Sequence, residues 1–178
     1  MADEFYPRLT DAGILNNRLW YSDNPFYQAG YGLPNCTCYA WGRCWEIGGG
    51  TPEHRPAFST GNAEDWYNYN DGYQRGPTPA LGAVLCLADG PFSGDGHVAV
   101  VEEIFSDNSI TVSESAWGAY FFQTERLYPP YYLTAAGYIF QGFIYYPYGG
   151  GQPVPPAGSK KIWYFKKLPW KNEKDILL

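Results

Sequence analysis

Residues 35–43 read Asn-Cys-Thr-Cys-Tyr-Ala-Trp-Gly-Arg, and this stretch predicts the helix around which the chain is organised. The preceding segment, residues 30–34, holds two glycines and a proline, a composition that disfavours a helix. Beyond it the pattern favours a helix over 37–47, with Asn35 where an N-cap residue belongs and three glycines at 48–50 as a stop. The sequence therefore places Cys36 in the first turn of a helix.

This position gives Cys36 two possible interpretations. Unpaired backbone N–H groups and the helix dipole favour a thiolate at a helix start, which suits a cysteine nucleophile. Free cysteines, however, are most often small buried residues without chemistry. The stretch alone leaves both interpretations open.

The length of 178 residues and the composition favour one aromatic, β-rich domain. Aromatic residues make up 19% of the chain and charged residues only 17%, which suits a groove for an uncharged polymer such as a glycan or a peptide. A net charge of −6 argues against a nucleic-acid partner. No apolar run approaches the ~18 residues of a membrane span, so no membrane partner is expected either.

The charges divide the chain into two unequal parts. All six lysines lie between 160 and 174, whereas the part before them carries 16 acidic residues against six arginines. A Gly/Pro-rich stretch separates the two. We therefore expect a domain at 1–148, a linker at 149–160 and a basic, aromatic tail at 161–178, which either adds an edge strand or connects to another module.

The order of the predicted elements indicates an α+β fold. Short helices are expected from Thr10 or Asp11 to Leu19, over 37–47, and over 61–67 with Asn62 as its cap. Strands are expected over 81–87, 97–105, 109–115, 119–126 and 138–146. This plan corresponds to short N-terminal helices packed on an antiparallel sheet of about five or six strands.

The four cysteines are predicted to be free thiols. Three of them, Cys36, Cys38 and Cys44, crowd one short helix, so only Cys86 could pair with any of them. Since no secretory leader is visible at the Met-Ala-Asp-Glu start, we expect synthesis in a reducing cytoplasm.

The chain has two histidines, and their surroundings differ. His54 lies in a proline-flanked loop, where a surface role is expected. His97 opens a valine-rich strand that follows Asp95-Gly96. Glu114 shares a strand face with Ile110 and Val112, where a carboxylate needs a partner.

An imidazole on the neighbouring strand is the available partner, although a turn centred on 107–108 would set His97 opposite Gly118. Direct pairing with Glu114 would therefore need a bulge or a shifted register. With a thiol at a helix start, these residues compose a Cys36–His97–Glu114 arrangement. In it the imidazole activates the thiol, the carboxylate orients the imidazole, and backbone N–H groups at the helix start form part of an oxyanion site.

Three segments in this order, 35–43, 96–102 and 110–117, resemble the CHAP domain, the cysteine, histidine-dependent amidohydrolase/peptidase family of bacterial and phage peptidoglycan hydrolases. The likeness runs from about Asn24 to Tyr146. It implies a papain-like fold and cleavage of a peptidoglycan amide, with Cys36 as nucleophile, His97 as base and Glu114 as third member. The chain departs from many relatives at Cys38, where they have an aromatic residue, and at Ala116, where they have asparagine.

The next predictions concern substrate, cofactor and metal binding. We expect substrate contacts from four residues (Tyr31, Asn35, Trp66 and Trp117), and no cofactor. Some phage members bind calcium just before the nucleophile, but residues 26–35 contain no acid, so no metal site is expected there.

Bacterial peptidoglycan is the expected partner, reached after release at lysis or as part of a phage virion. The basic tail is expected to bind anionic wall polymers or a virion protein. The alternatives are a non-catalytic wall-binding or tail module with the same fold, and a cysteine protease or deamidase that acts on protein.

Overall fold

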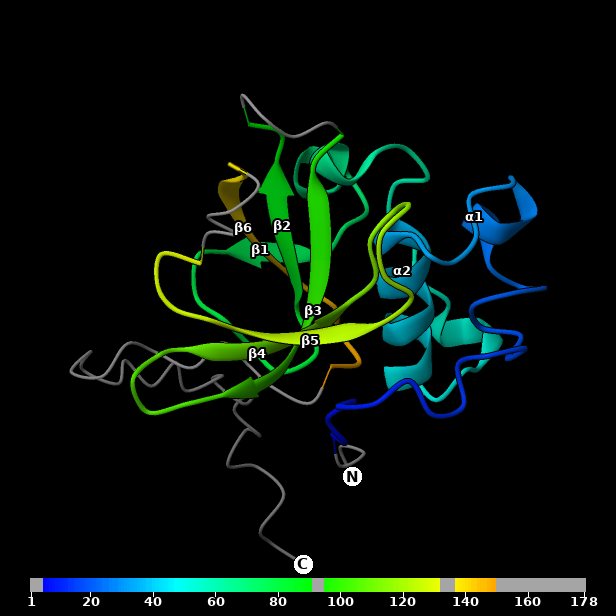
Figure 1. The fold of residues 1–178 in the computed structure, drawn as a ribbon, viewed down its shortest axis with the longest axis horizontal. Coiled ribbons are helices and arrows are strands. Elements are labelled where there is room, and N and C mark those ends of the chain that lie inside the picture. The colour runs from blue at the N-terminus through cyan, green and yellow to red at the C-terminus, as the bar shows by residue number, and fades with distance from the viewer. Residues whose placement is uncertain (1–4, 91–94, 132–136, 150–178) are drawn as a thin grey trace, which may run out of the picture.

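The computed structural model describes residues 5–90, 95–131 and 137–149 (Figure 1). The helical elements come first: α1 (Pro25–Gln28), α2 (Cys36–Ile47) and the 3-10 helices η1 (Pro52–His54) and η2 (Ala63–Asn68). Six strands follow: β1 (Gln74–Gly76), β2 (Val84–Ala88), β3 (His97–Ile104), β4 (Ile110–Glu114), β5 (Gln123–Leu127) and β6 (Ile139–Tyr145). Apart from Gly149, the predicted linker and tail lie outside the described residues.

The strands form one antiparallel sheet in the order β1-β6-β2-β3-β4-β5, with α1 and α2 to one side of it (Figure 1). The α+β prediction is thereby confirmed, as is the helix that begins at Cys36. The strand β1 was not predicted, because its sequence Gln-Arg-Gly has no apolar alternation. It forms through pairing with β6.

The predicted helix up to Leu19 is wrong. Residues 11–22 form a series of turns instead. Gly13 and Asn16 adopt left-handed backbone conformations, with φ of 77° and 59°. A right-handed helix cannot pass through such residues, so the turns replace it.

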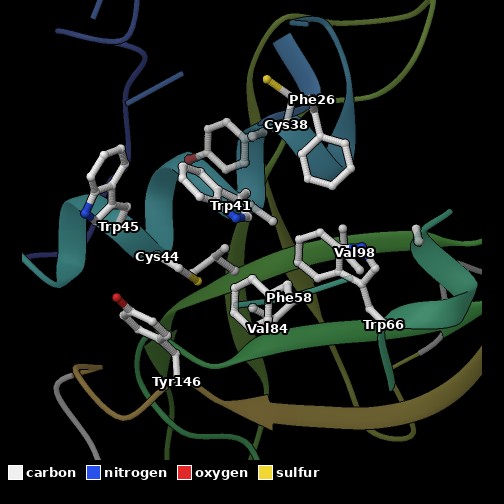
Figure 2. Packing of buried hydrophobic residues seen from close by; sticks show 14 of the residues in the cluster. Phe26, Cys38, Trp41, Cys44, Trp45, Phe58, Trp66, Val84, Val98 and Tyr146 are labelled. Atoms are coloured by element: carbon white, nitrogen blue, oxygen red, sulfur yellow. The ribbon is translucent and has the colours of Figure 1, made fainter. Parts of the chain in front are cut away.

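Strand alternation places apolar residues on both faces of the sheet. Val98 and Val100 pack with α2 and the large aromatic residues of the N-terminal half, whereas Ala99 and Val101 pack in a second cluster. Figure 2 shows the first of these clusters, with Trp41 of α2 above the strands. The helix that carries Cys36 is thus seated directly on the sheet.

A buried ion pair also fastens α2 to β3. The Arg43 guanidinium donates two hydrogen bonds of 2.9 Å to the Glu102 carboxylate. Ser113 of β4 donates to the same carboxylate at 2.6 Å, and the Tyr39 hydroxyl of α2 donates to Ser113 at 2.8 Å. The network joins one helix and two strands, and so limits how far Cys36 can shift relative to the sheet.

Candidate active site

Asn35 caps the helix that presents Cys36, as predicted. Its side-chain oxygen accepts hydrogen bonds from the backbone N–H groups of Thr37 at 2.9 Å and Cys38 at 3.3 Å. Its own N–H donates to the Ser115 hydroxyl at 3.0 Å, which ties the start of α2 to the end of β4. Cys36, which follows, is partly exposed. The Cys36 thiol is therefore held at the helix start and is accessible.

His97 reaches the site because the backbone at Gly96 packs closely against the backbone of Glu64 and Leu87. Gly96 has a φ of +72°, and a Cβ at that position would lie 2.6 Å from the Glu64 nitrogen and 2.7 Å from the Leu87 oxygen. Only glycine fits such a position without rearrangement. His97 itself is 4% exposed, and the Tyr138 ring stacks on it with a centroid distance of 5.7 Å.

The Glu114 carboxylate is fully buried and uses both oxygens. Its Oε2 lies 2.6 Å from Nε2 of His97. Its Oε1 accepts from the Tyr120 hydroxyl at 2.8 Å and from the Gln123 amide at 2.5 Å. The direct His97–Glu114 contact that the predicted hairpin register left in doubt is present.

A bulge in β3 makes this contact possible. The register shifts between Val101 and Glu103, so that Glu102 is an extra residue against β4. Val100 pairs with Ser113, so the same register sets Glu114 opposite Ala99, which is two residues after His97. Diagonal neighbours of this kind lie within reach of long side chains.

The electrostatics of the pair favour an imidazolium beside a carboxylate. Burial opposes the charge on His97, but hydrogen bonds to Cys36 and Glu114 outweigh it and raise the pKa of His97 to about 10. Burial likewise acts to raise the pKa of Glu114, and the contacts with His97, Gln123 and Tyr120 overcome it, so that this pKa is lowered. Because Nε2 faces Glu114, Nδ1 is the ring nitrogen available to the thiol.

A cleft of about 650 Å³ opens over Cys36 and His97. Three residues predicted to bind substrate line it: Tyr31, Asn35 and Trp117. The Tyr31 and Trp117 rings are 56% and 64% exposed, and their centroids lie 6.0 Å apart. Together they supply exposed aromatic surface to the cleft, and Asn62 and Asp95 supply polar groups.

The prediction for Trp66 is wrong. Its side chain is 0% exposed and stacks on Phe58 in the hydrophobic core, with ring centroids 4.7 Å apart (Figure 2). An aromatic residue in a short helix carries no sequence signal that separates a buried ring from an exposed one. Trp66 therefore supports the site from within the core and does not contact substrate.

Sequence reasoning missed several residues of the site. Tyr138 stacks on His97, and Tyr120 and Gln123 hold Glu114, but none belongs to a recognisable motif. Asn62 precedes η2 as predicted, yet its side chain makes no capping bond and donates to Asp95 at 2.6 Å instead. Strand pairing and loop packing bring these residues to the site, Asn62 and Tyr138 to the cleft itself and Tyr120 and Gln123 to Glu114 behind it.

The other cysteines and the second histidine lie apart from this site. Four cysteines are free, as predicted, and burial raises the pKa of Cys38 to about 12 and those of Cys44 and Cys86 as well. His54 lies with its Nδ1 2.8 Å from the Gly48 oxygen, and its ring stacks on Tyr148. Cys36 and His97 are therefore the thiol and imidazole that meet in the cleft.

Among the described residues, no group of three or more His, Cys, Asp or Glu side chains is arranged to hold a metal ion. In the same part of the chain, no helix has the length and apolar character that a membrane crossing requires.

The site thus brings a thiol and an imidazole together in one cleft, with a buried carboxylate bound to the imidazole. The profile of the CHAP domain family matches residues 26–116, which include all three side chains. The chain belongs to the CHAP domain family.

Similar proteins come from staphylococci. "Probable autolysin LDP" of Staphylococcus aureus is 36% identical over 100 residues, which cover 54% of this chain and 32% of that protein. "N-acetylmuramoyl-L-alanine amidase sle1" of Staphylococcus epidermidis is 38% identical over 86 residues, which cover 46% of this chain and 26% of that protein. The matches thus span about a third or less of these relatives' lengths.

A solved structure, that of an N-acetylmuramoyl-L-alanine amidase from Staphylococcus aureus, superposes with a TM-score of 0.48 at 26% identity. It covers 64% of this chain and 32% of that chain.

Proposed function

We propose that this protein is a peptidoglycan hydrolase that cleaves an amide bond with Cys36 as nucleophile, His97 as general base and Glu114 as the residue that orients His97. One observation carries the proposal: Cys36 and His97 line an open cleft, and hydrogen bonds link Cys36 through His97 to the buried Glu114 carboxylate. Family membership and the relatives named autolysin and amidase support peptidoglycan as the substrate.

The geometry supports a two-stage acyl transfer. With the proton held on His97, the Cys36 sulfur attacks the substrate carbonyl carbon to form a tetrahedral intermediate. Asn35 engages the N–H groups of Thr37 and Cys38, which leaves the N–H of Cys36 to stabilise the oxyanion. His97 then protonates the leaving amine as the C–N bond breaks.

In the second stage, water attacks the thioester and gives up a proton to His97, and the released thiol recovers that proton. Throughout both stages Glu114 holds the imidazole in one orientation and stabilises its charged form. The hydrogen-bonded Nε2 leaves Nδ1 to exchange protons with sulfur and substrate.

The lining of the cleft agrees with a largely uncharged ligand. Among the described residues that line it, none is lysine or arginine and Asp95 is the single carboxylate. Tyr31 and Trp117 offer exposed rings on which an apolar sugar or peptide surface can lie. The bond is either that between N-acetylmuramic acid and L-alanine or one within the peptide, and mass spectrometry of digested peptidoglycan distinguishes these products.

Substitution of the two reacting residues tests the proposal. We expect Cys36→Ala and His97→Ala each to abolish hydrolysis of purified cell walls, because the two act as a unit and either loss costs nearly as much as both. His54→Ala is the matched control and is expected to retain wild-type activity, since His54 lies outside the cleft. An inactive His54→Ala beside an active His97→Ala would contradict the assignment.

Two other functions make different predictions in a labelling experiment. A non-catalytic wall-binding or tail module would show four slow cysteines, whereas the proposed enzyme has Cys36 alone reacting fast with a thiol reagent at neutral pH. Cys38, Cys44 and Cys86 are buried and serve as internal controls. A protease would digest purified protein substrates, and a deamidase would release ammonia from their side-chain amides; either would leave the turbidity of a wall suspension unchanged.

A further inference from the structure

We propose that Tyr120 and Gln123 are positioning residues that fix the Glu114 carboxylate so that one of its oxygens always faces His97. The inference rests on the proposed function, in which His97 is the base that Glu114 orients. Neither residue belongs to the three that the sequence assigns to catalysis, and both come from the segment after β4.

The contacts divide the carboxylate between two tasks. Tyr120 and Gln123 both donate to Oε1 of Glu114, at 2.8 and 2.5 Å. The other oxygen, Oε2, lies 2.6 Å from Nε2 of His97. Rotation of the carboxylate would break all three bonds at once. Gln123 lies directly opposite Glu114 in the β4–β5 register, so strand pairing itself sets one of the donors.

Glu114 needs these partners because it is fully buried. An ionised carboxylate away from water is costly unless several donors satisfy its oxygens. Ala116, the residue two positions further along, has a methyl side chain and cannot donate a hydrogen bond. Among the described residues, Tyr120, Gln123 and His97 supply the hydrogen bonds that the Glu114 carboxylate accepts.

The hydrogen bonds from Tyr120 and Gln123 also affect which of the nearby carboxyl groups is ionised. The titratable groups around Glu114 are His97 and Cys36 on one side, Tyr120 and Glu125 on the other, and Tyr138 over the imidazole. Burial and then the Glu114 charge raise the pKa of Glu125. The donors on Oε1 ensure that Glu114, the carboxylate bonded to His97, is the one that stays ionised.

The test removes the donors while keeping the shapes of the side chains. Tyr120→Phe deletes one hydroxyl and Gln123→Leu deletes one amide, and Thr124→Ala on the exposed side of β5 is the control. We expect kcat/KM at neutral pH to fall about tenfold in each of the two variants, as for loss of a hydrogen bond to a charged group. The acidic limb of the pH profile should move to higher pH, because a carboxylate with fewer donors protonates more readily.

A second readout does not depend on activity. The chain has two histidines, so NMR titration of the imidazoles follows His97 with His54 as an internal reference. In both variants the His97 pKa should fall from its raised position, because a less firmly held carboxylate favours the imidazolium less. Thr124→Ala should leave it unchanged.

The outcomes separate this inference from the proposed function. An unchanged acidic limb and an unchanged His97 titration in folded Tyr120→Phe and Gln123→Leu would overturn the positioning role while leaving the proposed function intact. If Cys36→Ala kept wild-type activity, the proposed function would fail, and the NMR titration would still decide whether the two residues hold Glu114. Melting temperatures identify any variant that fails to fold. If one of Tyr120→Phe and Gln123→Leu does not fold, the other still removes a donor to Glu114 and tests the inference.

Discussion

At the residue scale, the site depends on a buried acid–base pair, His97 and Glu114, in which neither residue would be stable in its charged form without the other. His97 and Glu114 lie 2.6 Å apart with almost no exposure to solvent, and each stabilises the charged form of the other. Burial opposes both charges, so the pair persists only because hydrogen bonds from Tyr120 and Gln123 offset the loss of water. The imidazole is therefore held in one orientation before any substrate arrives.

Glu114→Gln should lower activity by less than loss of Cys36. Glutamine can still accept the imidazole N–H and orient the ring, but it carries no charge to stabilise the imidazolium. The measurement is kcat on purified walls, with Glu114→Ala for comparison, which we expect to be slower than Glu114→Gln. Wild-type rates in both variants would remove Glu114 from the site.

The same pair predicts how stability depends on pH. The His97 pKa is raised to about 10 in the folded protein, so its contribution is fully present below its unfolded value of ~6.5 and is lost as pH rises through 10. The Glu114 pKa is lowered, so its contribution is present above ~4.3 and is lost as pH falls through the folded value. Stability from the pair is therefore greatest between these limits.

Urea unfolding of the wild type and of His97→Ala measures this contribution. The difference in unfolding free energy between the two proteins should be larger at pH 6 than at pH 10. A difference that grows with rising pH would contradict the sign of the His97 shift.

At the element scale, α2 and the β3–β4 pair must keep a fixed relation for Cys36 to meet His97. The Arg43–Glu102 pair fastens the helix to β3, with side-chain exposures of 5% and 0%. Arg43→Ala would leave the Glu102 carboxylate buried without its cation, and such a loss typically costs about 3–5 kcal/mol. Denaturant unfolding should show this loss of stability.

An exposed ion pair supplies the control for that experiment. Arg126 and Asp107 lie 3.4 Å apart with side-chain exposures of 44% and 53%. Exposed pairs contribute about 0–1 kcal/mol, so Asp107→Asn, which removes the charge but leaves Arg126 on Ser109 and Phe105, should change the unfolding free energy far less than Arg43→Ala does. Equal losses in the two variants would show that the buried pair has no special role.

Local patterns predicted most of these elements, and pairing between distant strands determined the rest. The N-cap at Asn35 and the glycines after the helix are local signals, and the structure has α2 where they place it. The bulge at Glu102 has no local sequence signal, because it is a property of how β3 pairs with β4. For this reason the direct His97–Glu114 contact could not be predicted from local sequence patterns.

At the scale of the whole molecule, charge is segregated along the chain. The part before residue 160 has no lysine and is acidic, and all six lysines follow within 15 positions. The cleft, the residues Cys36, His97 and Glu114, and the six strands of the described part of the chain all belong to the first part. The proposed chemistry assigns no role to residues 159–178.

We predict that residues 159–178 serve attachment, either to anionic wall polymers or to a neighbouring virion protein. Six cations with Trp163, Tyr164 and Trp170 suit a salt-sensitive anchor, since attraction between exposed charges fades beyond a Debye length of ~10 Å at 0.1 M salt. A chain ending at Gly158 should keep its melting temperature and its rate on soluble muropeptides. It should bind intact walls more weakly at low salt, and that binding should no longer depend on salt.

The competing idea is that residues 162–165 add an edge strand and complete the core. In that case the chain ending at Gly158 would melt at a much lower temperature and lose activity on every substrate. A full-length variant with the six lysines replaced by glutamine separates the two ideas, because it removes the charge and retains the aromatic residues. Attachment through charge predicts that this variant loses salt-sensitive wall binding while its melting temperature stays at the wild-type value; a strand role predicts wild-type wall binding.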